Sequence, residues 1–105
     1  MKKKTCYISL PIEGRDIDEV KKEIENYKTG LRNRGYSLVS PFDREVDFNA
    51  THEQLMREDF KLLLDCDAIL MARNWERSVG CRAELNVALA CGIKIIYTMD
   101  TALLW

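Results

Sequence analysis

The order of the apolar segments is the feature that most constrains how this 105-residue chain can fold. Short apolar runs of strand length alternate with longer segments whose apolar residues recur every three or four positions, which is the helical repeat. The pattern predicts strands at residues 4–10, 36–40, 67–72 and 94–98, and helices at residues 17–34, 52–65 and 79–91. Repeated alternation of this kind is typical of a parallel sheet with helices on both faces and right-handed crossovers.

Local signals mark the ends of the predicted helices. Asp16 and Thr51 are each followed, three residues on, by a Glu or Gln that could complete a capping box. Ser78 is a good N-cap for the third helix. Gly35 and Gly92 stand where a glycine is expected just past a helix end.

We therefore predict a three-layer α/β fold of the Rossmann or flavodoxin type, in one domain covering residues 1–105. The simplest winding gives the strand order 2-1-3-4, with residues 99–105 as a fifth strand fragment or a subunit contact. In that order the chain reverses direction between the first and third strands, and ligands bind at the carboxyl ends beside this switch point. Those ends are residues 9–15 and 72–80, which is where we expect a site.

Composition and missing motifs narrow the function. The formal net charge of −1 leaves no basic excess to neutralise the phosphates of a nucleic acid. No stretch reaches the length of a membrane span, and no export signal follows the lysines near the start. The four cysteines form no C-x-x-C pair, so we expect no metal and a reduced, cytoplasmic setting. Glycine-rich motifs for dinucleotides or P-loop phosphates are also missing, so no cofactor is predicted.

Glu84 is the first candidate for chemistry. It falls in the second turn of the predicted third helix, and the residue one turn earlier on the same face is Gly80. Helical side chains lean toward the N-terminus, so this carboxylate would overhang a turn that has no side chain and leaves room for a ligand. The alternative is that Glu simply suits the first half of a helix because of the helix dipole.

Two further side chains could join Glu84 at the crevice. Tyr7 lies on the first strand and Asp59 on the second helix, although core packing and a solvated charge are the respective alternatives. A pair of carboxylates with a tyrosine suits displacement at the anomeric carbon of a sugar. Cys81, in a helix first turn, is a weaker alternative nucleophile because that position can lower a thiol pKa. His52 is expected to be solvated.

These residues also carry a resemblance to a known family. Besides Tyr7, it covers E-D-x-x-x-L-L-x-C-D-A at 58–68 and S-V-G-C-R-A-E-L-N-V-A at 78–88. The chain resembles the nucleoside 2-deoxyribosyltransferase superfamily, including its 2′-deoxynucleoside 5′-phosphate N-hydrolase branch, and is most similar to a short bacterial and phage branch. The resemblance implies that Glu84 is the nucleophile, that Tyr7 orients it and that Asp59 contacts the sugar.

The chain departs from the family pattern at two places. Ser78 stands where transferases carry an acidic residue six positions before the nucleophile, and a serine at a helix N-terminus suits a phosphate or a sugar hydroxyl. The first loop lacks the Gly/Ser pattern of the hydrolases, and Glu13 there would repel a phosphate unless Arg15 compensates. Phe42 and Trp75 could stack on a base or serve only as packing. The candidate substrate-binding residues are Ser9, Pro11, Gly14, Arg15, Phe42, Trp75, Ser78 and Gly80.

Three hypotheses about function follow. The first is an enzyme that cleaves or transfers the N-glycosidic bond of a deoxynucleoside or its 5′-monophosphate. The second is a non-catalytic module that binds a nucleotide or sugar phosphate, and the third is a small structural subunit. Retention of Tyr7, Asp59 and Glu84 favours the enzyme, whereas the altered first loop favours the binding module. In the first two, the partner is a small molecule rather than a nucleic acid or a membrane.

We predict a homodimer or a larger homo-oligomer. The apolar tail at residues 102–105 would be difficult for a lone domain of this size to cover. The resemblance agrees, because relatives complete their sites across subunit contacts. Sedimentation at micromolar concentration should show a dimer or larger species, and a monomer alone would contradict the prediction.

Overall fold

The computed structural model describes residues 4–43 and 49–98, and these contain one parallel sheet covered by three α-helices. The strand order is β2-β1-β3-β4, as predicted. The strands are β1 (Lys4–Ser9), β2 (Tyr36–Val39), β3 (Ala68–Met71) and β4 (Lys94–Tyr97), and the helices are α1 (Ile17–Asn33), α2 (His52–Leu64) and α3 (Val79–Ala90). The proposed fifth strand at residues 99–105 lies outside the described residues.

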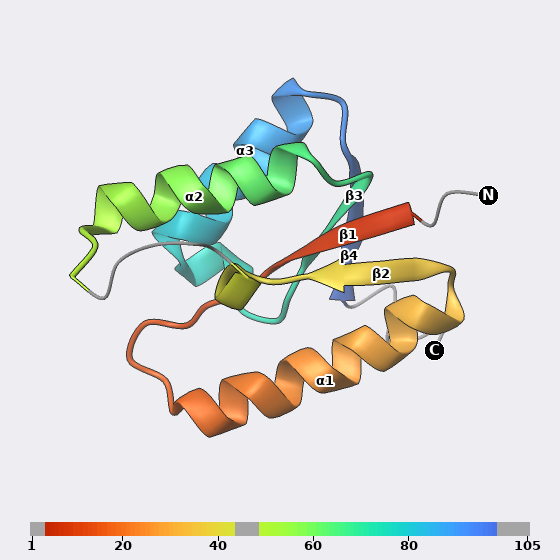
Figure 1. The fold of residues 1–105 in the computed structure, drawn as a ribbon, viewed down its shortest axis with the longest axis horizontal. Coiled ribbons are helices and arrows are strands. Elements are labelled where there is room, and N and C mark those ends of the chain that lie inside the picture. Colours follow the sequence, from red (N-terminus) through yellow and green to blue (C-terminus); the bar gives the residue numbers. More distant parts are fainter. Residues whose placement is uncertain (1–3, 44–48, 99–105) are drawn as a thin grey trace.

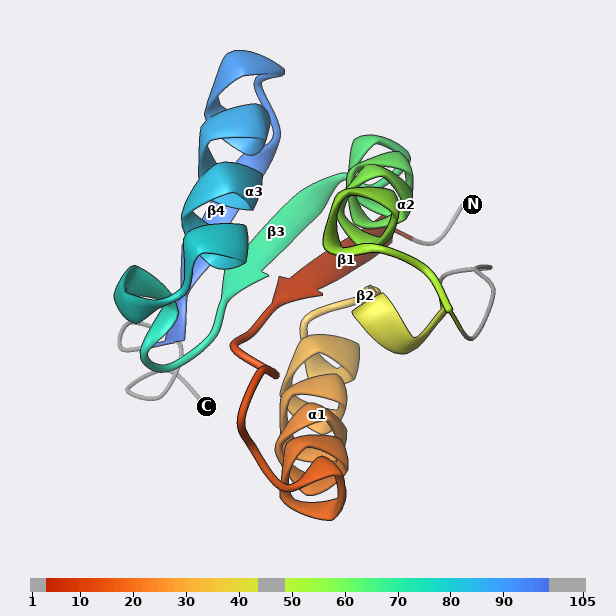
Figure 2. The same cartoon turned by 90° about the vertical axis from the view of Figure 1, so that its left-hand side faces the viewer.

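The helices divide between the two faces of the sheet. Helix α1 covers one face, and α2 and α3 lie together on the other (Figures 1 and 2). Each face has its own buried cluster, and β1 supplies both, because successive strand residues point to opposite faces. Cys6 and Ile8 belong to the α1 side, whereas Tyr7 belongs to the side of α2 and α3. Ser9 therefore follows Tyr7 onto the α2 and α3 side.

Strands β1 and β3 are the two central strands and meet at their carboxyl ends. In the register Tyr7 is opposite Ile69 and Ser9 is opposite Met71, and every residue of β3 is buried. The amide of Ala72 donates to the carbonyl of Ser9 at 2.9 Å, which extends the pairing one residue past β3. The two loops that leave this edge, after β1 and after β3, therefore start side by side.

The predicted helix caps are confirmed at two of three positions. Thr51 forms a full capping box, since its side chain accepts from the Gln54 amide and the Gln54 side chain accepts from the Thr51 amide. The Ser78 hydroxyl accepts from the amide of Cys81 at 3.2 Å. The capping box at Asp16 is wrong, because this side chain makes no cap hydrogen bond. Asp16 is exposed, so water can serve the first-turn amides instead.

The predicted boundaries need small corrections. Each strand ends one residue before the predicted end, and β3 also begins one residue later, because Asp67 instead accepts the Thr5 amide through its side chain at 2.8 Å. The loops after β2 and β3, predicted as irregular, contain short 3₁₀ helices at Pro41–Asp43 and Trp75–Arg77. The side chain of Asp43 closes the first of these by accepting the Ser40 amide at 2.8 Å.

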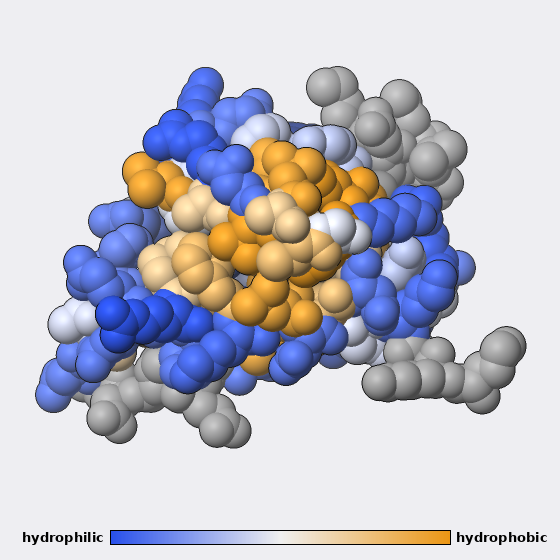
Figure 3. Space-filling model, turned by 90° about the horizontal axis from the view of Figure 1, so that it is seen from above, coloured by the Kyte–Doolittle hydropathy of each residue, from blue (hydrophilic) through white to orange (hydrophobic). Residues whose placement is uncertain are grey.

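The surface of α2 and α3 is unusually apolar. Figure 3 looks onto this side of the molecule, and apolar side chains gather at its middle with charged ones around them. Leu64, Val79 and Leu89 expose 51%, 67% and 60% of their surface, respectively. None of the helices that the structure describes is long and apolar enough to cross a membrane. The tail at residues 102–105, on which the oligomer prediction was based, is not among the described residues.

Candidate active site

A buried carboxylate held by two hydroxyl groups forms the centre of the site. Glu84 exposes only 4% of its surface. The Tyr7 hydroxyl donates to its Oε2 at 2.5 Å, and the Ser9 hydroxyl donates to its Oε1 at 2.7 Å. Each carboxylate oxygen thus has a hydrogen-bond donor. Such bonds favour the charged form of a buried carboxyl group and fix its orientation.

The sequence places these three side chains together through two simple periodicities. Tyr7 and Ser9 are two residues apart on β1, so both point to the face that α3 covers. Glu84 lies in the second turn of α3, and its side chain leans back toward the carboxyl end of the sheet. Ser9 was predicted to bind substrate, but the structure instead places its hydroxyl on Glu84.

Glu84 opens onto a cavity of about 600 Å³ between the loop after β1 and the helices α2 and α3. Asp59, predicted to reach the rim of the crevice, is buried and lines this cavity. Pro11, Ser78 and Gly80 line it as well. The full lining consists of Leu10, Pro11, Ile12, Glu13, Pro41, His52, Leu55, Met56, Asp59, Arg77, Ser78, Val79, Gly80, Cys81 and Glu84.

The expected space above Gly80 is smaller than the sequence suggested. A Cβ atom at this position would lie 3.4 Å from the Met56 sulfur, so the methionine side chain already occupies part of the space. Methionine is flexible and adapts to irregular gaps, and it can move when a ligand enters. The Ser78 hydroxyl is engaged as the helix cap, which leaves the amides of the next two residues, Val79 and Gly80, beyond the reach of intrahelical bonds.

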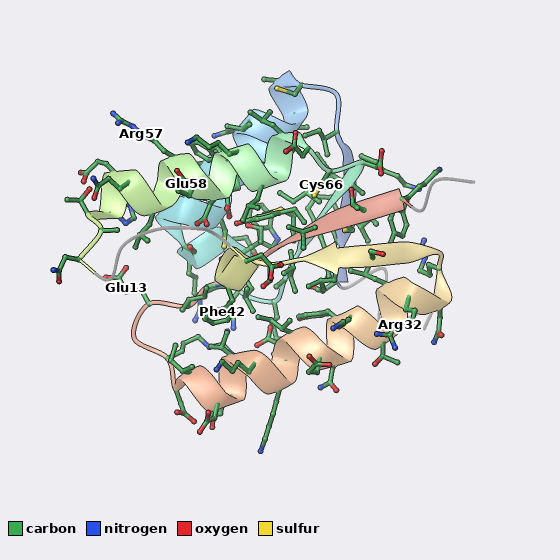
Figure 4. The ribbon with its side chains drawn as sticks, viewed as in Figure 1. Glu13, Arg32, Phe42, Arg57, Glu58 and Cys66 are labelled. Atoms are coloured by element: carbon green, nitrogen blue, oxygen red, sulfur yellow. The ribbon has the colours of Figure 1, made fainter. Side chains whose placement is uncertain are left out.

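Besides Ser9, four predicted binding residues do not line the cavity. Arg15 turns toward α1, where it pairs with Glu23 at 2.6 Å. Trp75 packs against the core and against the ring of Tyr97, with the ring centroids 6.0 Å apart. Phe42 lies between the end of β2 and α1 (Figure 4) and has the Lys21 ammonium 6.0 Å from its ring centroid. Gly14 adopts a positive φ of 77° in the loop after β1.

Sequence reasoning missed several lining residues. Leu55 and Met56 precede Asp59 by one helical turn, so the i, i+3 and i+4 relation could have identified them once Asp59 was chosen. Arg77 lines the cavity because the 3₁₀ helix before α3 brings it there, and no sequence signal marked that turn. His52 is exposed, as predicted, but also lies on the cavity wall.

The thiol of Cys81 is not activated. Burial raises the pKa of Cys81 above its ordinary value, and the nearby charges of Glu84 and Asp59 raise it further. Hydrogen bonds with Ser78 and Ser9 lower the pKa only in part. The first-turn position therefore does not produce the low pKa considered from the sequence, because desolvation and two carboxylates outweigh the helix terminus. Among the residues described, no group of three or more His, Cys, Asp or Glu side chains is placed to hold a metal ion.

Solved structures share this fold. A conserved protein from Enterococcus faecalis V583 matches with a TM-score of 0.70 and 17% identity, covering 91% of this chain and 63% of its own. A 2-deoxyribosyltransferase from Leishmania mexicana matches with a TM-score of 0.69 and 21% identity, and the match covers 90% of this chain and 63% of that protein. A CMP N-glycosidase from Clostridium botulinum matches with a TM-score of 0.63 and 21% identity, and the match covers 90% of this chain and 70% of that protein. The chain thus spans 63% of the length of the first two proteins.

These similarities establish the class of protein first: an α/β protein with the fold of the deoxyribosyltransferases. The chain belongs to the family described as Domain of unknown function (DUF4406), whose family model matches residues 4–97. No curated protein matches it by sequence.

Alkylation should distinguish the two cysteines of α3 and its C-cap. At pH 8 we expect iodoacetamide to modify the exposed Cys91 at least about tenfold faster than the buried Cys81, because a raised pKa leaves less thiolate at that pH. Mass spectrometry of peptides after timed labelling measures both rates. The urea-unfolded protein is the control, where the rates should converge. Rapid labelling of Cys81 in the folded protein would show an activated thiol.

Proposed function

We propose that the protein is an enzyme that cleaves or transfers the N-glycosidic bond of a deoxynucleoside or its 5′-monophosphate. The observation that carries the proposal is the buried Glu84 carboxylate, held by Tyr7 and Ser9 at the wall of a cavity of about 600 Å³. Desolvated carboxylates are costly, and proteins keep them where charge is needed for chemistry. The shared fold with a deoxyribosyltransferase and a CMP N-glycosidase supports the same class of reaction.

In the proposed first step, an oxygen of Glu84 attacks the anomeric carbon, and the base leaves with the electron pair of the broken C–N bond. The product is a deoxyribosyl ester of Glu84. In the second step water or another base attacks the same carbon, and the carboxylate leaves. The hydrogen bonds from Tyr7 and Ser9 fix the orientation of the carboxylate for this attack. Asp59 is placed to accept a hydrogen bond from a sugar hydroxyl.

We infer that the phosphate of a phosphorylated substrate would bind at one end of the cavity, beside Arg77. Glu13, Asp59 and Glu84 are acidic, so a phosphate needs a compensating group. Arg77 supplies a permanent positive charge on the cavity wall. Arg77 immediately precedes the helix cap, next to the unpaired amides at the start of α3, which suits an anion.

The alternative function is a module that binds such a ligand without turnover. The Met56 side chain above Gly80 favours this alternative, because it narrows the space beside Glu84. Chromatographic detection of free base from a panel of deoxynucleosides and their 5′-monophosphates separates the two functions. Base release supports the enzyme, whereas ligand binding without base release supports the module.

Replacing the proposed nucleophile should abolish turnover and spare the fold. In Glu84→Gln an amide cannot attack the anomeric carbon, so base release should fall by about 10³-fold or more. The Tyr7 or Ser9 hydroxyl can rotate to accept a hydrogen bond from the new side-chain amide, so the free energy of unfolding should fall by only about 1–2 kcal/mol. Base release and thermal unfolding are measured together, with the exposed Glu76→Gln as the control. Unchanged turnover in Glu84→Gln would refute the assignment.

Phosphate recognition can be tested through Arg77. Arg77→Met should raise the KM for 5′-monophosphates by about tenfold, because one charge-assisted hydrogen bond is lost, and leave the KM for nucleosides nearly unchanged. Arg57→Met is the matched control, since Arg57 points away from the body of the molecule on α2 (Figure 4). Equal changes for both substrate classes would mean that Arg77 does not contact a phosphate.

A further inference from the structure

The loop between β1 and α1 forms one wall of the Glu84 cavity. Leu10, Pro11, Ile12 and Glu13 all line that cavity, and the loop continues directly from Ser9, which donates to Glu84. A second, smaller cavity of about 430 Å³ lies on the α1 side of the same loop, and Pro11 lines both. The position of this short segment therefore sets the shape of the site.

Few backbone hydrogen bonds hold the loop in place, although Leu10 and Ile12 pack on the apolar cluster beneath α1. The amide of Arg15 donates to the carbonyl of Ile12 at 3.1 Å, which closes one turn. Gly14 has a positive φ, and Pro11 has no amide hydrogen to donate. At the far end, Asp16 makes no side-chain cap on α1. Between the end of β1 and the start of α1, the backbone of this loop thus makes a single backbone–backbone hydrogen bond within the described residues.

The Arg15 side chain adds two further hydrogen bonds that connect this loop to α1. Its Nη1 donates to the carbonyl of Pro11 at 2.8 Å, and its Nη2 donates to Oε1 of Glu23 at 2.6 Å. Glu23 lies in the second turn of α1, inside a regular helix. A planar guanidinium can make both bonds at once, which an ammonium group does poorly. The two hydrogen bonds of the Arg15 guanidinium, which we call the Arg15 fork, therefore connect the cavity wall to helix α1.

Glu23 is built for this role rather than for solvent. Its Oε2 is buried and within ordinary hydrogen-bond length of no donor among the described residues, although Tyr27 interacts with this carboxylate, so the carboxylate is partly desolvated. A carboxylate in that state depends on a cation, and Arg15 is the side chain that forms a salt bridge with it. The salt bridge of Lys61 and Glu58 on α2, joined at 2.9 Å, differs in that the lysine exposes 71% of its side chain, and ion pairs with a solvated partner contribute little.

We propose that Arg15 and Glu23 are positioning residues that hold the Pro11 wall of the Glu84 cavity. Arg15 does so through the Pro11 carbonyl, and Glu23 does so by fixing the guanidinium. This inference rests on the proposed function for its kinetic consequence, but the loop position itself does not depend on any substrate.

Nuclear magnetic resonance of the whole chain tests the loop directly. In Arg15→Met, the amide exchange rate of residue 15 should rise about tenfold relative to that of Gly35, whose amide closes the opposite end of α1. Arg15→Lys keeps the charge beside Glu23 but not the fork, so it should show an intermediate rise. Glu23→Gln should also raise the ratio of the residue 15 exchange rate to the Gly35 exchange rate, and Lys61→Met should leave this ratio unchanged. An unchanged ratio in Arg15→Met overturns the proposal, and a merely structural role would raise both rates together.

Kinetics separates a positioning role from direct substrate contact. If Arg15 acts through Pro11, Arg15→Met and Glu23→Gln should both raise KM several-fold, equally for nucleosides and 5′-monophosphates, with a smaller change in kcat. If Arg15→Met raised KM only for the 5′-monophosphates and Glu23→Gln left KM unchanged, Arg15 would bind the phosphate itself, and the proposal would be overturned. If no substrate is cleaved by any variant or by the parent protein, the proposed function fails while the exchange ratio still decides the role of the loop.

Discussion

A carboxylate with 4% of its surface exposed is stable only if the protein replaces the water that it loses. In this structure the replacement comes from the hydroxyls of Tyr7 and Ser9, both fully buried on β1. These bonds couple the central strand to α3, which otherwise meets the sheet through apolar side chains such as Leu85 and Ala88. The placement of α3, and with it the cavity, therefore depends on two hydroxyl groups that a hydrophobic core alone would not require.

The sheet order, the three helices and the meeting of Tyr7 with Glu84 could be predicted because each follows from a period. Two-residue alternation puts Tyr7 and Cys6 on opposite faces of β1, and the 3.6-residue repeat orients Glu84 within α3. Order 2-1-3-4 then brings the carboxyl ends of β1 and β3 together. Asp59 lines the cavity for the same reason, since α2 packs on the face that Tyr7 points to.

The roles of loop side chains could not be predicted, because tertiary partners decide where they point. Arg15 was expected at a phosphate, yet Glu23, eight residues along, captures it on the other side of the loop. For Trp75 the sequence left stacking on a base and packing open, and in the structure it packs against Tyr97 and the core. Arg77 went unnoticed because its place depends on a 3₁₀ turn without a sequence signature. In each example a contact distant in the sequence or a local turn, and not the residue type, sets where the side chain points.

Strand β1 assigns its alternate residues to two different tasks, and this has an evolutionary consequence. Tyr7 and Ser9 serve the carboxylate, while Cys6 and Ile8 fill the apolar layer beneath α1. Because the side-chain period of a strand is two, inserting or deleting one residue early in β1 would exchange the two sets at once. Hydroxyls would enter the apolar layer, and the thiol of Cys6 and the aliphatic side chain of Ile8 would face Glu84. Lineages of this family should therefore vary by substitution in β1 and accept length changes only beyond it.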